Sequence, residues 1–91
     1  MPSPLRNNLA LSRFELDANG VTAVMNYRLA GNVLTLNHTE TPSAARRRGI
    51  ASRLVEAVLQ EARSRGFKIV PRCPFVRAYV AKHPECRDLV A

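Results

Sequence analysis

The spacing of apolar residues along the chain changes near residue 49. Between residues 13 and 39, apolar side chains recur at every second position, as expected for strands with one buried face. From Ile50 onward they recur at intervals of three and four residues, which is the period of an amphipathic helix. The chain therefore predicts a set of strands followed by a helix that packs on them.

The strand region predicts a three-stranded antiparallel meander. The segment "RFELDANGVTAVMNYRL" contains Asn19-Gly20, a pair that supplies the two positive φ angles of a tight type I′ turn. A second turn, "AGN" at residues 30–32, precedes the strand "VLTLNHT". If the pleat of this third strand is uninterrupted, Leu34, Leu36 and His38 lie on one face.

The helical region predicts one long helix, a short strand and a second helix. The apolar stripe of the long helix comprises Ile50, Ala51, Leu54, Val55, Val58, Leu59 and Ala62. Gly66 stands where a left-handed helix end is expected. "FKIV" predicts a fourth strand that Pro71 closes, and "PFVRAYVAKH" predicts a shorter helix, which Pro84 ends. The side chains expected to face inward from this helix are Phe75, Val76, Tyr79 and Val80.

These elements define an α+β fold: a three-stranded antiparallel meander, a long helix, a fourth strand and a short helix. Residues 1–12 hold two prolines and no clear period, so we expect a flexible lead-in there. Residues 13–91 then form a single domain, because a chain of 91 residues has room for one core.

The charge of the chain favours an anionic partner without naming one. Fourteen Lys and Arg oppose seven Asp and Glu, which leaves a formal charge of +7. A field of this sign attracts nucleic acids and phosphorylated cofactors alike. The arginines are not interleaved with aromatic residues, and the predicted helices carry no row of base-reading side chains, which argues against nucleic acid.

Other compositional features bound the setting of the protein. The chain has no apolar run long enough to span a membrane and no basic-then-apolar leader at its start, so we expect a cytoplasmic location and no membrane partner. Cys73 and Cys86 form no Cys-x-x-Cys pair and are expected to be thiols. No metal site is expected, because the His, Cys and acidic residues lack ligand spacing.

The loop "PSAARRRG" before the long helix has the composition of a phosphate cradle. The first turn of a helix has unpaired N–H groups and the positive end of the helix dipole. Gly49 lets an anion approach the backbone closely, and Arg46 adds donors suited to phosphate oxygens. Arg47 and Arg48 either reach phosphates as well or are plain surface charge.

The spacing Arg46-x-x-Gly49-x-Ala51 resembles the (Gln/Arg)-x-x-Gly-x-(Gly/Ala) motif of the GNAT superfamily of N-acetyltransferases. The flanking strings "HTETP", "IVPRCPF" and "YVAKHPE" are similar to a minimal, single-domain branch of these proteins. The resemblance implies acetyl-coenzyme A (acetyl-CoA) as cofactor and an amine, such as a protein or peptide lysine, as acceptor. It implies that main-chain groups of Thr39 and Thr41 pair with the pantetheine. It also implies that the pyrophosphate is held at Arg46, Arg47, Arg48, Gly49, Ile50 and Ala51.

Two residues at the end of the third strand are candidate bases. His38 and Glu40 stand two apart, so they lie on one face of that strand. The intrinsic pKa of a histidine suits a proton acceptor, and Glu40 could act directly or through a water. Alternatively, His38 is a polar strand-end residue and Glu40 is a partner for a nearby arginine.

Three further residues are candidates near the second helix. Cys73 has Arg72 beside it and precedes a helix, which favours a thiolate. The resemblance implies that this thiol faces the acetyl group. The thiol would then either accept the acetyl group or protonate the departing sulfur of coenzyme A. Alternatively, Cys73 is a small buried residue of the core. The resemblance also implies a tyrosine acid at Tyr79, although Tyr79 equally fits the core. His83 caps the helix and belongs to the resemblance.

Two classes of function remain open from the sequence. One is an acetyl-CoA-dependent N-acetyltransferase. The other is a non-catalytic module that binds CoA, or a basic module that binds nucleic acid or another anion.

Overall fold

The computed structural model describes residues 5–18, 20–42 and 49–91. Its elements, in chain order, are β1 (Leu5–Asn8), η1 (Leu9–Leu11), β2 (Arg13–Ala18), β3 (Val21–Ala30), β4 (Val33–Glu40), α2 (Ile50–Ser64), β5 (Lys68–Pro71), α3 (Pro74–Lys82) and η2 (Pro84–Leu89). Within these residues no helix is both long and apolar enough to cross a bilayer.

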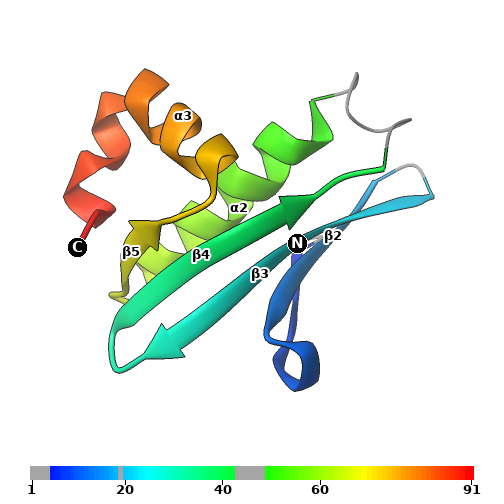
Figure 1. Cartoon of the computed structure of the whole chain (residues 1–91), viewed down its shortest axis with the longest axis horizontal. Coiled ribbons are helices and arrows are strands. Elements are labelled where there is room, and N and C mark those ends of the chain that lie inside the picture. Colours follow the sequence, from blue (N-terminus) through cyan, green and yellow to red (C-terminus); the bar gives the residue numbers. More distant parts are fainter. Residues whose placement is uncertain (1–4, 19, 43–48) are drawn as a thin grey trace.

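The described strands form one sheet in the order β1-β2-β3-β4-β5, shown in Figure 1. The first four strands are antiparallel neighbours, whereas β5 pairs with β4 in parallel. A parallel pair needs a crossover connection, and α2 is part of it. Figure 1 looks onto the sheet face opposite α2, and no described helix crosses this face. We call it the open face.

The core lies between the sheet and α2. The buried side of α2 comprises Ile50, Leu54, Val55, Val58, Leu59 and Ala62, which is the predicted stripe without Ala51; that residue is half-buried. It packs on sheet residues that include Phe14, Leu16, Met25, Leu34, Leu36 and Ile69. Gly66 has the expected positive φ, at 72°, and Glu61 and Arg65 form an ion pair on the outer side of α2. The hydrophobic pattern therefore located the long helix and its buried side correctly.

The α+β class is confirmed, but the meander has an additional strand. Residues 5–8 form β1 and pair with β2, from Leu5 opposite Leu16 to Asn8 opposite Arg13. The prediction of a loose lead-in is therefore wrong for these residues. The Tyr27 hydroxyl donates to Asn7 Oδ1 at 2.6 Å, and the Asn8 side chain caps η1. These polar contacts leave no periodic pattern of apolar residues in the sequence, so the sequence did not predict this strand.

The second helix differs from the prediction in which side chains it buries. Val76 and Val80 of α3 are buried as expected, and Tyr79 is half-buried. Phe75, however, is 41% exposed, so its assignment to the core is wrong. Phe75 is not part of the core cluster and instead borders surface hollows near the start of α2.

A bulge in β4 decides which polar side chains face which side of the sheet. Asn26 pairs with His38, but the next residue, Tyr27, pairs with Leu36. Asn37 is thus the extra residue, and an extra residue reverses the alternation beyond it. The prediction that His38 shares a face with Leu34 and Leu36 is therefore wrong, because the pleat is interrupted.

Strands β4 and β5 part where β5 ends. Their pairing runs from Val33 opposite Lys68 to Leu36 opposite Pro71. The N–H groups of Arg72 and Cys73 both donate to the Leu36 carbonyl, at 3.1 and 2.9 Å. The chain then turns into α3, while β4 continues to Glu40. Residues 37–40 consequently have no described strand beside them on the β5 side.

Candidate active site

The start of α2 presents backbone N–H groups beside an exposed glycine. Gly49 caps the helix with φ 68° and ψ 21°, and its carbonyl accepts the first ladder bond, from the Arg53 N–H at 3.1 Å. The N–H groups of residues 50–52 therefore precede the helical ladder. No described atom lies within 4 Å of the place that a Cβ on Gly49 would take. This arrangement can receive an anion at the positive end of the helix dipole.

A pocket connects this helix start to the end of β4. Its volume is about 290 Å³. We call it the strand-end pocket. It is lined by Thr39, Thr41, Gly49, Ala51, Ser52 and Phe75. Polar strand-end residues and an exposed aromatic ring thus share one hollow with the helix start.

Cys73 lies directly behind the wall of the strand-end pocket. Its Sγ is 3.3 Å from Thr39 Oγ1, and the residue is 4% exposed. Thr39 faces this side because it pairs with the buried Met25 beyond the bulge. Cys73 is also the N-cap residue of α3.

The surroundings of Cys73 stabilise its anionic form. Burial raises the pKa of the thiol, but hydrogen bonds from the Thr39 hydroxyl and from the backbone N–H groups of Val76, Phe75 and Thr39 outweigh burial. The pKa of Cys73 therefore lies below its ordinary value, in the way that a helix N-terminus lowers a thiol pKa. By contrast, burial raises the pKa of the half-buried Cys86.

His38 and Glu40 lie on the open face, on the other side of β4 from Cys73. His38 Nε2 is 4.0 Å from Glu40 Oε1, and their side chains are 64% and 74% exposed. They share a face, as the sequence predicted. The bulge at Asn37 puts that face opposite Thr39.

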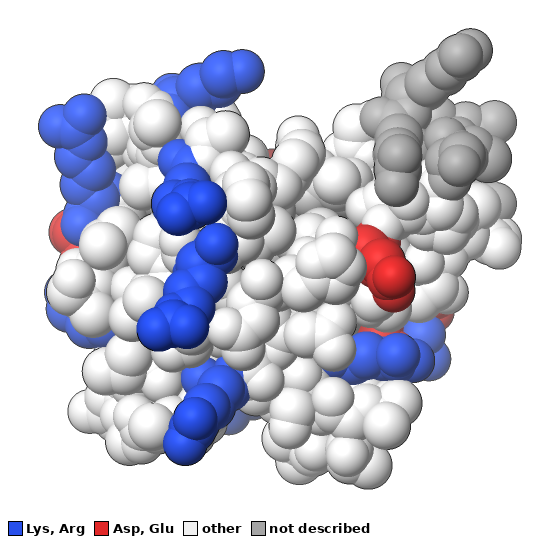
Figure 2. All heavy atoms as spheres, viewed as in Figure 1, with Lys and Arg blue, Asp and Glu red and all other residues white. Residues whose placement is uncertain are grey.

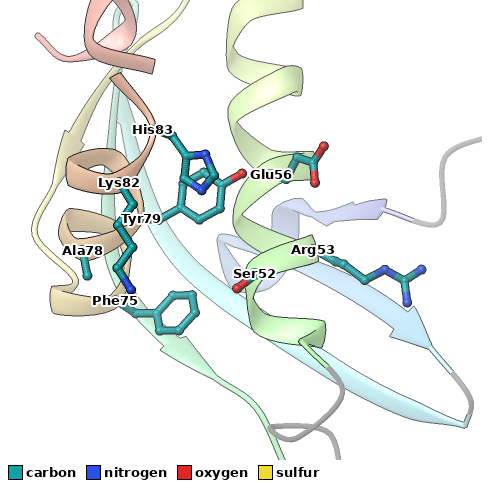
Figure 3. Close-up of a pocket in the computed structure, with 8 residues that line it drawn as sticks. All are labelled: Ser52, Arg53, Glu56, Phe75, Ala78, Tyr79, Lys82 and His83. Atoms are coloured by element: carbon teal, nitrogen blue, oxygen red, sulfur yellow. The ribbon is translucent and has the colours of Figure 1, made fainter. Parts of the chain in front are cut away.

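Tyr79 and His83 line a different hollow, between α2 and α3. We call it the interhelical groove. Its volume is about 340 Å³, and its lining is Ser52, Arg53, Glu56, Phe75, Ala78, Tyr79, Lys82 and His83 (Figure 3). The two rings stack with centroids 4.0 Å apart, and His83 Nδ1 lies 3.2 Å from Glu85 Oε1. Burial, with smaller contributions from Glu56, Cys86 and Glu85, raises the pKa of Tyr79.

The structure thus divides the candidate residues into three groups. Thr39, Thr41, Gly49, Ala51 and Cys73 gather at the strand-end pocket, and Ile50 is buried at the start of α2. His38 and Glu40 share the open face, and Tyr79 and His83 share the interhelical groove. Arg46, Arg47 and Arg48 lie outside the described residues.

Two lining residues escaped the sequence reasoning. Ser52 and Phe75 border both the strand-end pocket and the interhelical groove. Ser52 stands on the first turn of α2, directly after the glycine, and this position could have suggested it. Phe75 was assigned to the core because it is apolar, so its place in a pocket lining was not predicted.

The comparisons with known proteins agree with this architecture. The family model described as GCN5-related N-acetyl-transferase matches residues 13–89. The chain therefore belongs to the GCN5-related N-acetyltransferase family, and its class is that of an N-acetyltransferase.

Named relatives support the same assignment, and a solved structure shares the fold. The chain is 31% identical to Protein NATD1 of Gallus gallus, over 91% of this chain and 78% of that protein. It is 35% identical to Protein NATD1 of Mus musculus, over 79% of this chain and 68% of that protein. The NMR solution structure of a GCN5-like protein from Staphylococcus aureus has the same fold, with a TM-score of 0.73 and 23% identity, over 100% of this chain and 91% of that one.

Proposed function

We propose that the protein transfers the acetyl group of acetyl-CoA to an amine, with the cofactor bound on the helix side of the sheet. The observation that carries this proposal is the strand-end pocket, which joins an open helix start to a thiol of lowered pKa. Thr39 lines the pocket and also contacts Cys73 Sγ at 3.3 Å.

The residues present fit the chemical parts of the cofactor. The N–H groups at the start of α2 suit a pyrophosphate, and the exposed Gly49 leaves room for it. The parting of β4 from β5 leaves no described strand beside Thr39 on the β5 side, so an extended amide chain such as pantetheine would lie along the strand end there, with Thr41 also lining the pocket. Arg46, Arg47 and Arg48 precede Gly49 and would add charge there.

Proton movements then fall to residues on opposite sides of β4. Bound acetyl-CoA supplies a thioester carbonyl carbon for the amine to attack. Glu40, or His38 beside it, takes a proton from the amine on the open face. Cys73 Sγ gives its proton to the departing sulfur on the helix side, because its hydrogen bonds stabilise the thiolate that remains. Tyr79 and His83 lie in the interhelical groove and stay candidates for a supporting role.

Thermal unfolding and intact-mass measurements with acetyl-CoA test this proposal together. A ligand of the folded state at a hundredfold excess over its Kd stabilises by about 2.7 kcal/mol. We expect CoA to raise the Tm and, in the presence of an amine acceptor, free CoA to be released. A lasting mass increase of one acetyl group on Cys73 would instead assign the thiol the role of acetyl carrier.

The alternative functions give different results in the same measurements. A Tm increase with CoA and no transfer to any amine would indicate a non-catalytic CoA-binding module. Stabilisation by an oligonucleotide with steep salt dependence, and none by CoA, would indicate a nucleic-acid-binding protein.

A further inference from the structure

A polar groove on the open face carries two arginines that have no carboxylate partner within the described residues. We call it the arginine groove. It crosses β3, β4 and β5 and has a volume of about 430 Å³. It is lined by Arg28, Ala30, Thr35, Asn37, Val70 and Arg72.

The sheet register puts these side chains on one surface. Arg28 of β3 pairs with Thr35 of β4, and Thr35 pairs with Val70 of β5. These residues alternate with the buried Leu34, Leu36 and Ile69, so they face away from α2. The lining therefore combines the Thr35 hydroxyl and the Asn37 amide with one guanidinium from β3 and one from the residue directly after β5.

The charges of the groove are unbalanced. All seven acidic residues of the chain are among the described residues, and the ion pairs that arginines form with them involve Arg6, Arg13, Arg63 and Arg65. Figure 2 shows basic side chains in a row across this face, over the part of the sheet that holds β5. Two like charges at one groove repel each other, and an anion bound between them would relieve that repulsion.

The groove lies next to the residues that would handle the acceptor amine. Arg72 directly precedes Cys73, and its N–H is fixed to the Leu36 carbonyl at the point where β4 and β5 part. Asn37 is the bulge residue directly before His38. The rest of an acceptor whose amine lies at His38 and Glu40 on the open face would therefore be beside the groove.

We infer that the arginine groove binds a carboxylate of the acceptor, so that the preferred acceptors are amines that also carry a carboxylate. Arginine suits this role because its planar guanidinium can donate two parallel hydrogen bonds to a carboxylate. The inference rests on the proposed transferase function and names the acceptor class for it. A nucleic-acid phosphate is the competing anion.

A matched pair of acceptors tests the inference directly. Nα-acetyl-L-lysine and its C-terminal amide share the same ε-amine and differ only in the carboxylate. We expect the wild-type protein to acetylate the carboxylate compound with a kcat/KM at least about tenfold higher, since a charge-assisted hydrogen bond is typically worth this much. The double variant Arg28→Gln with Arg72→Gln should lose that preference, so that the two compounds react with similar kcat/KM values.

A second double variant controls for net charge. Arg77→Gln with Arg87→Gln removes two exposed charges that lie outside the arginine groove, and it should keep the preference. Loss of the preference in both double variants would assign it to the long-range field and overturn the inference. Equal rates for the two compounds with the wild-type protein would overturn it as well.

A binding measurement separates failure of this inference from failure of the transferase proposal. Saturation-transfer NMR should show Nα-acetyl-L-lysine bound to the wild-type protein, weaker binding of the amide, and loss of the difference in the Arg28/Arg72 double variant. If this pattern appears without any acetyl transfer, the groove stands and the transferase proposal fails. If a single-stranded oligonucleotide binds through the two arginines and the carboxylate compound does not, the inference is wrong.

Discussion

The two sides of the end of β4 differ in almost every physical property. On the helix side, Thr39 and the buried Cys73 are in contact, and the thiol has a lowered pKa. On the open face, His38 and Glu40 are largely exposed and lie 4.0 Å apart. The bulge residue Asn37 separates the two sets. One inserted residue thus places the candidate general acid and the candidate general bases on opposite sides of a single strand.

This comparison gives each side a different task in the proposed reaction. The helix side offers preformed N–H donors and a pocket, which suits a cofactor that must be held in one position. The open face offers solvent access and two exposed side chains that can accept a proton, which suit an exchanging acceptor. Changes on the helix side should therefore alter cofactor binding or proton donation, whereas changes on the open face should alter the use of the acceptor.

The largest effect is expected from Cys73→Ala. Removing a general acid typically lowers turnover by about 10²- to 10⁴-fold. Because Cys73 lies behind the pocket wall, the Tm increase caused by CoA should persist in this variant. Turnover equal to that of the wild type would reduce Cys73 to a packing residue. Cys86→Ala is the matched control, since that thiol lies outside the strand-end pocket.

Gly49→Asp should next disrupt the helix side at the cofactor itself. A carboxylate at the start of α2 would occupy the anion position and repel a pyrophosphate. We expect CoA affinity, measured by titration calorimetry, to fall about 100-fold, since two like charges at short range cost a few kcal/mol. Gly49→Asn is the control, because Asn tolerates a positive φ and adds no charge. Equal losses in both variants would attribute the effect to backbone strain.

On the open face, Glu40→Gln with His38→Gln should lower turnover by about 100-fold, within the range of general base catalysis. Either single substitution should cost less, because the neighbouring group can still accept the proton. The Kd for CoA should stay unchanged, since neither side chain lines the strand-end pocket. A weaker Kd for CoA in the double variant would show that the two sides are not separate.

Thr39→Val should move the pH dependence of turnover. The thiol must be protonated to act as an acid, so turnover falls as the pH rises through the pKa of Cys73. The Thr39 hydroxyl lowers that pKa, so its removal raises the pKa and shifts the alkaline limb to higher pH. Thr35→Val, which changes a hydroxyl on the open face, should leave the limb in place. If the alkaline limb does not move in the Thr39→Val variant, the limb reports the titration of a group other than Cys73.

The smallest effect is expected from Tyr79→Phe. Tyr79 lies in the interhelical groove and stacks on His83, and the phenylalanine ring preserves that packing. We expect turnover to fall less than about tenfold, below the usual contribution of a general acid. A loss as large as that of Cys73→Ala would transfer the acid role to Tyr79.

The sequence predicted the elements whose signals are local and periodic. The stripe on α2, the end of that helix at Gly66 and the turn at Asn19-Gly20 follow from spacing and turn chemistry, although Asn19 itself lies outside the described residues. Strand β1 was missed because it is held by pairing with β2 and by a bond from Tyr27 to Asn7, and such long-range contacts have no local pattern.

The candidate site was predictable in composition but not in arrangement. Gly49, Thr39 and Cys73 could be nominated from motif and resemblance, and the pocket brings them together. His38 and Cys73 lie on opposite sides of the sheet because of a bulge at Asn37. No glycine or proline within the strand indicates that bulge. Arg28 and Arg72 were invisible as a pair, because the sheet register alone places them at one groove.

The most direct test of the two-sided strand end is a backbone-amide NMR titration with CoA. The account predicts that amide signals of Gly49, Ala51, Ser52 and Thr39 shift with CoA concentration, while those of Arg28 and Thr35 on the open face do not. Shifts confined to the open-face amides, or no shift at the start of α2, would contradict it.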